Sequence, residues 1–104
     1  MKQINYILVN ETGNETAVRA IGNSTVSELR HHNIIINAVP GWRVAGSRER
    51  QALIDELCRL RRHWPDAKIL GVSEIDPSAS HAPVRANPEM NALRREMSDK
   101  VDFY

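Results

Sequence analysis

The hydrophobic residues of this chain fall mainly into short runs, which predict strands. Residues 4–9 (INYILV), 33–39 (NIIINAV) and 67–72 (AKILGV) are rich in the residues typical of buried strands. Two shorter segments, 16–21 (TAVRAI) and 42–45 (WRVA), follow the turn residues Gly-Asn and Pro-Gly and predict strands that return as hairpins. We therefore expect a small mixed sheet of three to four strands.

One segment repeats its hydrophobic residues with the period of a helix instead. Its stripe consists of Leu53, Leu57, Leu60 and Trp64. The spacings of 4, 3 and 4 residues place these side chains on one helical face. Because Ser47 is a favourable N-cap and Pro65 stops a helix, we expect a long helix over residues 47–64 that packs on the sheet.

Two further segments predict helices, which completes the expected fold. Residues 23–33 carry a small apolar face, and residues 88–100 begin with proline after a capping Asn87. A helix followed by a short buried strand is typical of α/β units. We expect one domain, residues 1–104, of the α/β or α+β class with three helices.

The composition is that of an ordinary globular protein, and it excludes several classes. The 104 residues are 41% hydrophobic, and 14 basic against 13 acidic residues give a net charge of +1. This balance excludes a general electrostatic attraction to nucleic acid or to an anionic membrane. Cys58 is the single cysteine, which excludes an internal disulfide and a cysteine-rich zinc module. Because there is no apolar run of about 18 residues and no signal-peptide pattern, we expect a cytoplasmic protein without a membrane span.

Residues 50–83, RQALIDELCRLRRHWPDAKILGVSEIDPSASHAP, resemble the zinc-dependent N-acetylmuramoyl-L-alanine amidases of the phage-lysozyme and peptidoglycan-recognition type. In that family, a similar helix ends in an aromatic-Pro-Asp-Ala turn, and a short strand ending in Gly-His follows. The family's first strand, first helix, hairpin and last helix resemble residues 4–13, 25–33, 34–46 and 86–97. A central strand would be absent between Gly46 and Ser47, so the resemblance implies a truncated amidase-like domain.

The resemblance places the family's three zinc-ligand positions on residues that are not zinc ligands. They fall at Asn10, Val72 and Ala82, with Ser80 in place of Ala82 if the gap differs. A catalytic zinc needs about three nitrogen, sulfur or carboxylate ligands. The family's catalytic tyrosine also has no counterpart, because Asn33 and Ile34 stand there. Since this hydrolysis depends on a zinc-bound water, we expect a pseudoenzyme with no metal, no cofactor and no catalytic residue.

The histidines and the loop after residue 72 offer two other constellations of reactive side chains. The first consists of His31, His32, His63 and His81, with Cys58. Their spacings match no metal-ligand pattern, so we interpret them as ordinary polar or core residues. The second has the residue types of a catalytic triad, Asp76, Ser80 and His81, but the GxSxG elbow is absent. An altered hydrolase would require the histidines to converge near Asn10 and Val72.

Several residues are candidates for contact with a partner. Trp42, with Arg43 beside it, is interpreted either as an exposed anchor for a partner protein or as a core residue. Arg59 and Arg62 share one face of the long helix, which is either a solvated face or a contact for phosphate. The remaining candidates are His81, Phe103 and Tyr104.

These observations lead to one functional hypothesis and three alternatives. We expect a non-catalytic, amidase-derived binding protein that is associated with phage or prophage. It would bind a host or defence macromolecule, for example to inhibit it, and the expected partner is another protein. The alternatives are binding of peptidoglycan fragments, residual hydrolysis of the cell wall, and nucleic-acid binding through the arginine-rich helix. A shortened sheet would expose an edge, which a homodimer or a partner protein would cover.

Overall fold

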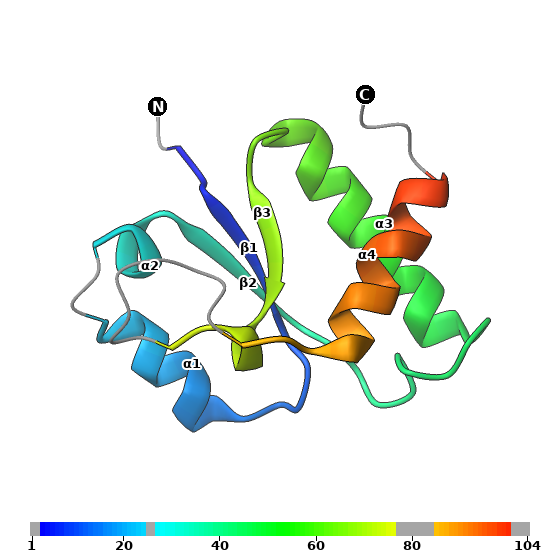
Figure 1. Ribbon diagram of the computed structural model, residues 1–104, viewed down its shortest axis with the longest axis horizontal. Helices are drawn as coiled ribbons and strands as arrows, with labels where there is room; N and C mark the ends of the chain where they lie inside the picture. Colours follow the sequence, from blue (N-terminus) through cyan, green and yellow to red (C-terminus); the bar gives the residue numbers. More distant parts are fainter. Residues whose placement is uncertain (1–2, 25–26, 77–84, 101–104) are drawn as a thin grey trace.

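The computed structural model describes residues 3–24, 27–76 and 85–100, which form a three-stranded parallel sheet between two layers of helices (Figure 1). The strands are β1 (Tyr6–Asn10), β2 (Asn33–Asn37) and β3 (Lys68–Gly71). β1 is central, in the order β2-β1-β3. Tyr6 is level with Asn33 and with Lys68, so the carboxyl ends of the strands lie at the same edge of the sheet.

Helices connect the strands across opposite faces of this sheet. The path from β1 to β2 contains α1 (Glu15–Gly22) and α2 (Ser27–His31), and the path from β2 to β3 contains α3 (Arg48–His63). After β3 come a 3-10 turn, η1 (Val72–Glu74), and α4 (Pro88–Lys100), which lies beside α3. Parallel crossovers are right-handed. The first crossover leads from the central β1 to β2 at one edge, and the second leads back past β1 to β3 at the other edge. Because these two directions are opposite, α1 and α2 cover one face of the sheet and α3 and α4 cover the other (Figure 1).

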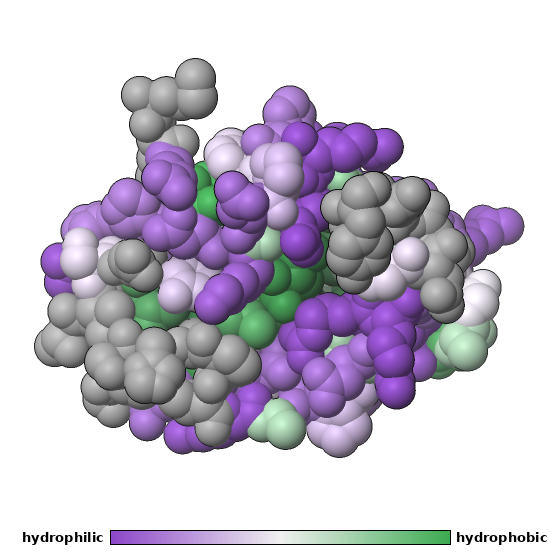
Figure 2. Space-filling model, turned by 45° about the horizontal axis from the view of Figure 1, so that its top comes forward, coloured by the Kyte–Doolittle hydropathy of each residue, from purple (hydrophilic) through white to green (hydrophobic). Residues whose placement is uncertain are grey.

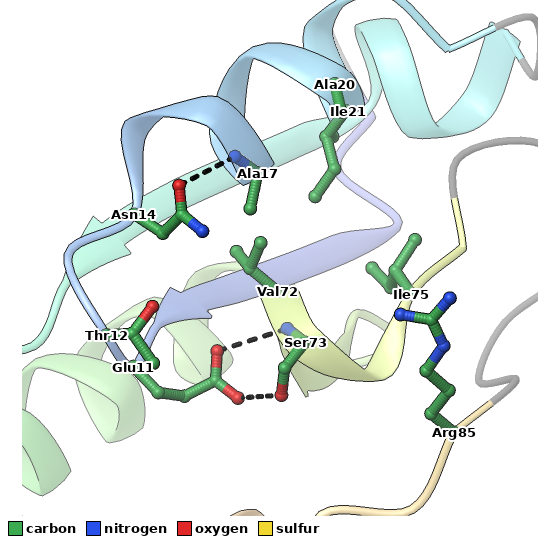
Figure 3. A pocket seen from close by; sticks show the side chains of 10 residues that line it. All are labelled: Glu11, Thr12, Asn14, Ala17, Ala20, Ile21, Val72, Ser73, Ile75 and Arg85. Carbon is green, nitrogen blue, oxygen red and sulfur yellow. Dashed lines mark hydrogen bonds between the residues drawn. The ribbon is translucent and has the colours of Figure 1, made fainter.

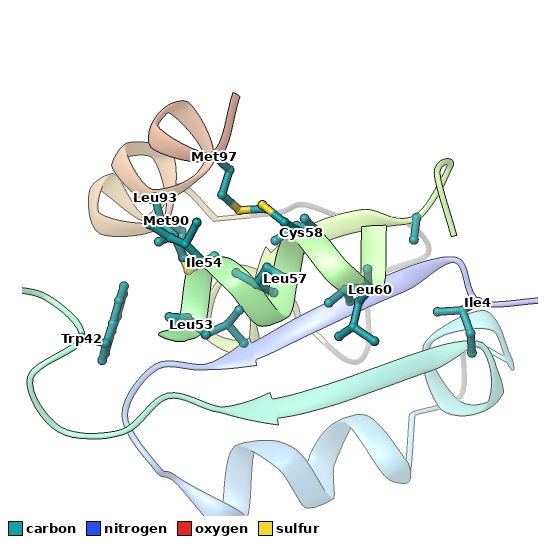
Figure 4. Packing of buried hydrophobic residues seen from close by; sticks show 14 residues of the cluster. Ile4, Trp42, Leu53, Ile54, Leu57, Cys58, Leu60, Met90, Leu93 and Met97 are labelled. Atoms are coloured by element: carbon teal, nitrogen blue, oxygen red, sulfur yellow. The ribbon is translucent and has the colours of Figure 1, made fainter. Parts of the chain in front are cut away.

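The side chains of β1 alternate between two hydrophobic cores. Ile7 and Val9 belong to the larger core, which α3 and α4 cover (Figure 4). Tyr6 and Leu8 belong to the smaller core, on the side of α1 and α2. β1 is buried at every position, as expected for the central strand of a parallel sheet covered on both faces.

The structure confirms the α/β class and the main predicted elements. α3 covers residues 48–63, and Ser47 is its N-cap, whose hydroxyl oxygen accepts a hydrogen bond from the Arg50 amide at 3.1 Å. Three leucines of the predicted stripe are buried, and Trp64 is partly buried against the same core. Cys58 is also buried in this core, as its position near the stripe predicts. The predicted strands at 33–39 and 67–72 contain β2 and β3, and β1 overlaps the predicted strand 4–9 and extends one residue beyond it, to Asn10.

The two predicted hairpins are wrong. Residues 16–21 belong to α1, because the Asn14 side chain accepts hydrogen bonds from two first-turn amides at 2.9 and 3.3 Å and caps a helix. Residues 42–45 lie in turns rather than in a strand, between Gly41 and Gly46, which have positive φ angles of 98° and 76°. The described sheet is therefore parallel throughout instead of mixed.

The surface of the described residues is largely polar. Hydrophilic residues predominate on the face shown in Figure 2, and hydrophobic surface appears in its middle and at one margin. Val39 and Val44 are the large hydrophobic residues most exposed in the described part of the chain, at 51% and 61%. No helix in the described ranges is both long enough and apolar enough to cross a membrane.

Candidate functional site

The candidate site lies where the carboxyl ends of β1 and β3 meet. From this point the chain leaves β1 for α1 on one face of the sheet and leaves β3 for α4 on the other face (Figure 1). In open parallel sheets, such a reversal leaves a crevice at the carboxyl edge, and these folds bind their ligands there. Polar residues follow both strands, with Glu11 and Thr12 after β1 and Ser73 soon after β3.

A pocket of about 350 Å³ occupies this crevice (Figure 3). Its apolar wall consists of Ala17, Ala20, Ile21, Val72 and Ile75. Its other lining residues are Glu11, Thr12, Asn14, Ser73 and Arg85. A mostly apolar cavity of several hundred Å³ with a few placed polar groups is the usual form of a small-molecule site.

Glu11 contributes a buried carboxylate to this pocket. The residue is 4% exposed, and its Oε1 accepts a hydrogen bond from the Ser73 amide at 3.2 Å. Its Oε2 accepts hydrogen bonds from the Ser73 hydroxyl and from Asn87 Nδ2, the latter at 2.8 Å. Asn87 in turn accepts a hydrogen bond from the Glu89 amide at 2.9 Å, in the first turn of α4. The carboxylate therefore connects β1, η1 and α4.

Within the described residues, the Glu11 carboxylate has neutral hydrogen-bond donors and forms no ion pair with a cationic side chain. None of the ion pairs among the described residues includes Glu11. Arg43 donates to the backbone carbonyl of Glu11 at 3.2 Å and pairs with Glu89 instead. A buried charge without a counter-ion costs several kcal/mol unless hydrogen bonds offset the lost hydration. Such a carboxylate is a candidate for ligand binding, because a ligand can supply a further hydrogen-bond donor.

Glu74 is a second buried carboxylate at this edge, but all of its bonding is internal. It is 2% exposed and forms a two-bond pair with Arg94 at 2.7 and 2.9 Å. It also accepts a hydrogen bond from the Gly71 amide at 2.8 Å. Burial raises the pKa of this carboxyl, but the hydrogen bonds and the charge of Arg94 outweigh burial, so the pKa lies below its ordinary value. Glu74 therefore stays ionised and holds η1 to α4.

Among the described residues that line the pocket, Arg85 is the cationic one. Its amide donates to the Glu74 carbonyl at 3.2 Å, which fixes its backbone beside η1. In Figure 3, its side chain lies beside Ile75, across the pocket from Glu11. The N-terminus of α1 favours an anion less, because Asn14 occupies two of its amides and Glu15 lies in its first turn. An anionic group in this pocket would therefore be recognised mainly by Arg85.

Two of the three positions at which the amidase resemblance places zinc ligands lie at this edge of the sheet. Asn10 is 2% exposed at the end of β1, and its Nδ2 donates to Asn37 Oδ1 at 3.0 Å. Val72 is buried and forms part of the apolar wall. The positions outside the described residues are Ser80, His81, Ala82, Phe103 and Tyr104.

Trp42 is a core residue and not an exposed anchor. It is 1% exposed, because the turns after β2 fold its ring against the core under α3 and α4 (Figure 4). Its Nε1 donates to the Glu11 backbone carbonyl at 3.2 Å. Arg43 lies over the ring, 4.7 Å from its centre, and pairs with Glu89 at 2.5 Å. These two candidates therefore support the end of β1 from the side of α3 and α4.

The other described candidates lie toward the opposite, amino edge of the sheet. Arg59 and Arg62 are exposed in the last turns of α3, and His63 ends that helix. His31 and His32 precede β2, and the His32 carbonyl accepts a hydrogen bond from the first amide of β1 at 3.1 Å. The described histidines are therefore separated by the length of the strands from Asn10 and Val72, where the resemblance places zinc ligands. No cluster of three metal-ligating side chains occurs in the described part of the chain.

Sequence reasoning missed Glu11, Ser73 and Arg85 as members of one site. Glu11 directly follows the predicted strand 4–9 and its neighbour Asn10, and Ser73 directly follows the predicted strand 67–72. In a parallel sheet, these positions meet at the carboxyl edge. Because a mixed sheet is expected from the sequence, the strand ends are not predicted to meet at one edge. Arg85 gave no signal, because only the return of the chain to α4 brings it to the pocket.

No protein-family model, curated protein or solved structure matches this chain. The resemblance to amidases therefore stays a prediction. Because folds of this kind serve many functions, the function must be argued from the site itself.

Proposed function

We propose that this protein is a non-catalytic binding protein that holds a small organic anion in the pocket at the carboxyl edge of its sheet. The observation that carries the proposal is the buried Glu11 carboxylate, which lines an apolar pocket and has no cationic side chain beside it in the described part of the chain. The location supports it independently, because open parallel sheets bind ligands at this reversal of the chain.

The lining of the pocket defines the chemistry of the ligand. Glu11 is an acceptor, so it selects a hydroxyl, amide or amine donor at one end of the ligand. The wall formed by α1 and the turn after β3 accommodates an apolar portion. Arg85, on the other side, selects a carboxylate or phosphate. Muramyl peptides and nucleoside monophosphates both combine these three features.

The same lining favours binding over catalysis. Among the described residues that line the pocket, the side chains with a formal charge are Glu11 and Arg85, and arginine stays protonated at neutral pH, so it is no general acid or base. Glu74 is held ionised by Arg94 and is no proton donor. General acid–base chemistry would depend on Glu11 alone, whereas glycoside hydrolysis uses two carboxyl groups.

The predicted nucleic-acid interface receives less support from the contacts of α3. Arg59 forms an ion pair with Glu56 at 2.5 Å, and Arg61 donates to the Pro65 carbonyl at 2.8 Å. Both guanidinium groups are therefore partly committed within the chain. Association with phage and inhibition of a host or defence protein stay predictions, and we propose the cytoplasm as the compartment because Cys58 is single and buried.

Isothermal titration calorimetry with three probes tests the proposed function. Muramyl dipeptide and adenosine monophosphate carry a donor, an apolar portion and an anionic group, whereas inorganic phosphate carries only the anion. We expect at least one organic probe to bind with one site per chain and phosphate to bind far more weakly. The absence of binding by both organic probes would contradict the proposal.

Variants of the two charged lining residues locate the binding. Glu11→Gln and Arg85→Ala should each weaken binding about tenfold or more, since a hydrogen bond to a charged group contributes roughly 1.5–3 kcal/mol. Arg62→Ala is the matched control, because it removes an exposed arginine at the amino edge. Unfolding curves show whether each variant keeps its fold. Binding that survives both pocket substitutions unchanged would place the ligand elsewhere.

A further inference from the structure

We propose that two copies of this chain pair through the open edge of β2 and form one continuous sheet across a two-fold axis. β2 is an edge strand, because the described sheet has the order β2-β1-β3. An edge strand presents unpaired N–H and C=O groups, which are a template for another strand. This edge lies on the far side of β1 from β3, away from the ligand pocket.

The backbone of β2 offers its hydrogen-bonding groups at alternate residues. The His32 carbonyl and the Ala38 amide bond to β1, at 3.1 Å each. Backbone groups of a strand point to alternate sides, so the even-numbered residues face β1 and the odd-numbered residues face outward. Asn33, Ile35 and Asn37 therefore present their amides and carbonyls to the open edge.

The sequence of β2 is a palindrome, Asn33-Ile34-Ile35-Ile36-Asn37. If a second copy pairs in antiparallel fashion with Ile35 on the two-fold axis, Asn33 lies opposite Asn37 of the partner subunit. All three outward-facing residues then form hydrogen-bonded pairs, because these pairs recur at every second residue. An isologous interface requires such a self-complementary surface.

The side chains of β2 match in the same register. Ile34 and Ile36 are partly buried against the core under α3 and α4, and Ile35 is partly buried on the other face. Pairing places Ile34 beside the partner's Ile36 on one face and Ile35 beside the partner's Ile35 on the other. These contacts would complete the burial of three isoleucines, and β-branched cross-strand pairs stabilise sheets.

Charges beside the edge are complementary under the same two-fold axis. A groove of about 150 Å³ runs between the end of β2 and α3, and its lining includes Ile36, Glu49 and Glu56. One helical turn further toward the amino edge lies Arg59, which contacts Glu56 in the same chain. In an antiparallel pair, the amino edge of the partner's sheet lies beside this acidic part of the groove. Glu56 then approaches the partner's Arg59, and by the two-fold symmetry Arg59 approaches the partner's Glu56. This complementarity favours a second copy over an acidic peptide.

Protective features of edge strands are absent from β2. Natural edges are commonly blocked by lysine, proline or a bulge. The five residues of β2 contain no charge and no proline, and their register with β1 is continuous. Among the described strands, none pairs with this outer edge of β2.

Cysteine cross-linking tests the proposed register. Ile34→Cys and Ile36→Cys are prepared separately in a Cys58→Ala background, one of them labelled with ¹⁵N, and are then mixed and oxidised. Positions 34 and 36 of different copies would be about 4.5 Å apart between Cα atoms, which suits a disulfide. We expect linked dimers that contain one copy of each variant, and few from either variant alone. Equal linking within each variant alone would overturn the register.

Analytical ultracentrifugation tests the dimer itself. The wild-type chain should be dimeric, and Ile35→Lys, which places two like charges on the axis, should be monomeric. Val44→Lys is the matched control, because it changes an exposed valine away from β2. A wild-type chain that stays monomeric at the highest attainable concentration would overturn the proposal, and so would a dimer that Ile35→Lys leaves intact.

A charge-swap series keeps the test decisive if Ile35→Lys fails to fold. Glu56 and Arg59 are both at least 40% exposed, so their substitution should leave the monomer folded. Arg59→Glu should weaken the dimer about three- to tenfold through like-charge repulsion. Glu56→Arg added to Arg59→Glu restores the opposite charges and should restore the dimer. Equal dimer affinity in all three chains would overturn the two-fold arrangement.

Discussion

Gly71 is the residue that lets the end of β3 pack against Glu11. A Cβ atom added there would lie 2.6 Å from Cδ of Glu11, in the candidate site, and 2.8 Å from Cγ of Met90, in the larger core. Gly71→Ala should therefore lower the free energy of unfolding by about 1–3 kcal/mol, as overpacking does. It should also weaken ligand binding, because Glu11 must move. Urea denaturation and calorimetry measure the two effects.

Gly22→Ala is the control for this substitution. Gly22 lies in α1 with open space around its Cα, and its φ is not positive. Alanine is the better helix former by up to about 1 kcal/mol, so this variant should be as stable as the wild type or more stable. If both glycine variants lose the same stability, the packing at Gly71 is not the cause.

Glu74 predicts a dependence of stability on pH. Its folded-state pKa is lower than its ordinary value of 4.5, so its ionised form stabilises the folded state above that pH. This contribution is lost as the pH falls below about 4.5, through the lower pKa of the folded state. Glu74→Gln should cost about 2–3 kcal/mol at neutral pH, because Arg94 loses its partner, and should flatten the acid limb of the stability curve.

Glu56→Gln is the matched control for Glu74→Gln. Glu56 also pairs with an arginine that lowers the pKa of its carboxyl, but both partners are at least 40% exposed. Surface pairs contribute between zero and about 1 kcal/mol, so this variant should lose little stability. Denaturation at several pH values compares the two variants, and an equal loss would show that burial of Glu74 is unimportant.

At the scale of elements, α3 depends on its N-cap. The Ser47 hydroxyl accepts a hydrogen bond from the Arg50 amide and donates to the Gly41 carbonyl at 2.8 Å. Ser47→Ala should reduce the free energy of unfolding by about 1 kcal/mol. Ser98→Ala is the control, because that exposed serine lies within α4 and bonds only the Arg94 carbonyl in the described structure. A greater loss at Ser98 would contradict the capping role.

Elements with a clear hydrophobic pattern could be predicted from the sequence, and the segment 16–21 could not. The leucine stripe and the cap at Ser47 define α3, and the apolar runs define the three strands. The segment 16–21 is ambiguous, because Thr, Val and Ile favour strands while Asn14 can act as a turn residue or as a helix cap. Its helical form becomes evident only from the two amides that Asn14 binds.

At the scale of the whole molecule, strand order determines the site and is not encoded locally. β1 lies between strands that follow it by more than 20 and more than 50 residues, and no local pattern specifies this arrangement. The sequence could identify Glu11 and Ser73 as polar residues after strands, but their contact depends on the pairing of β1 with β3. The sequence left Trp42 open between an exposed anchor and a core residue, and the structure shows a core residue, because the turns after β2 bury it.

The most direct test of the central claim is an amide NMR titration of the full chain with adenosine monophosphate and muramyl dipeptide. We expect saturable shifts at the amides of Thr12, Gly13 and Ser73, which lie in or beside the pocket, and none at His31 or Arg62 at the amino edge. Shifts confined to the amino edge, or no shifts with either compound, would contradict a ligand site at the carboxyl edge of the sheet.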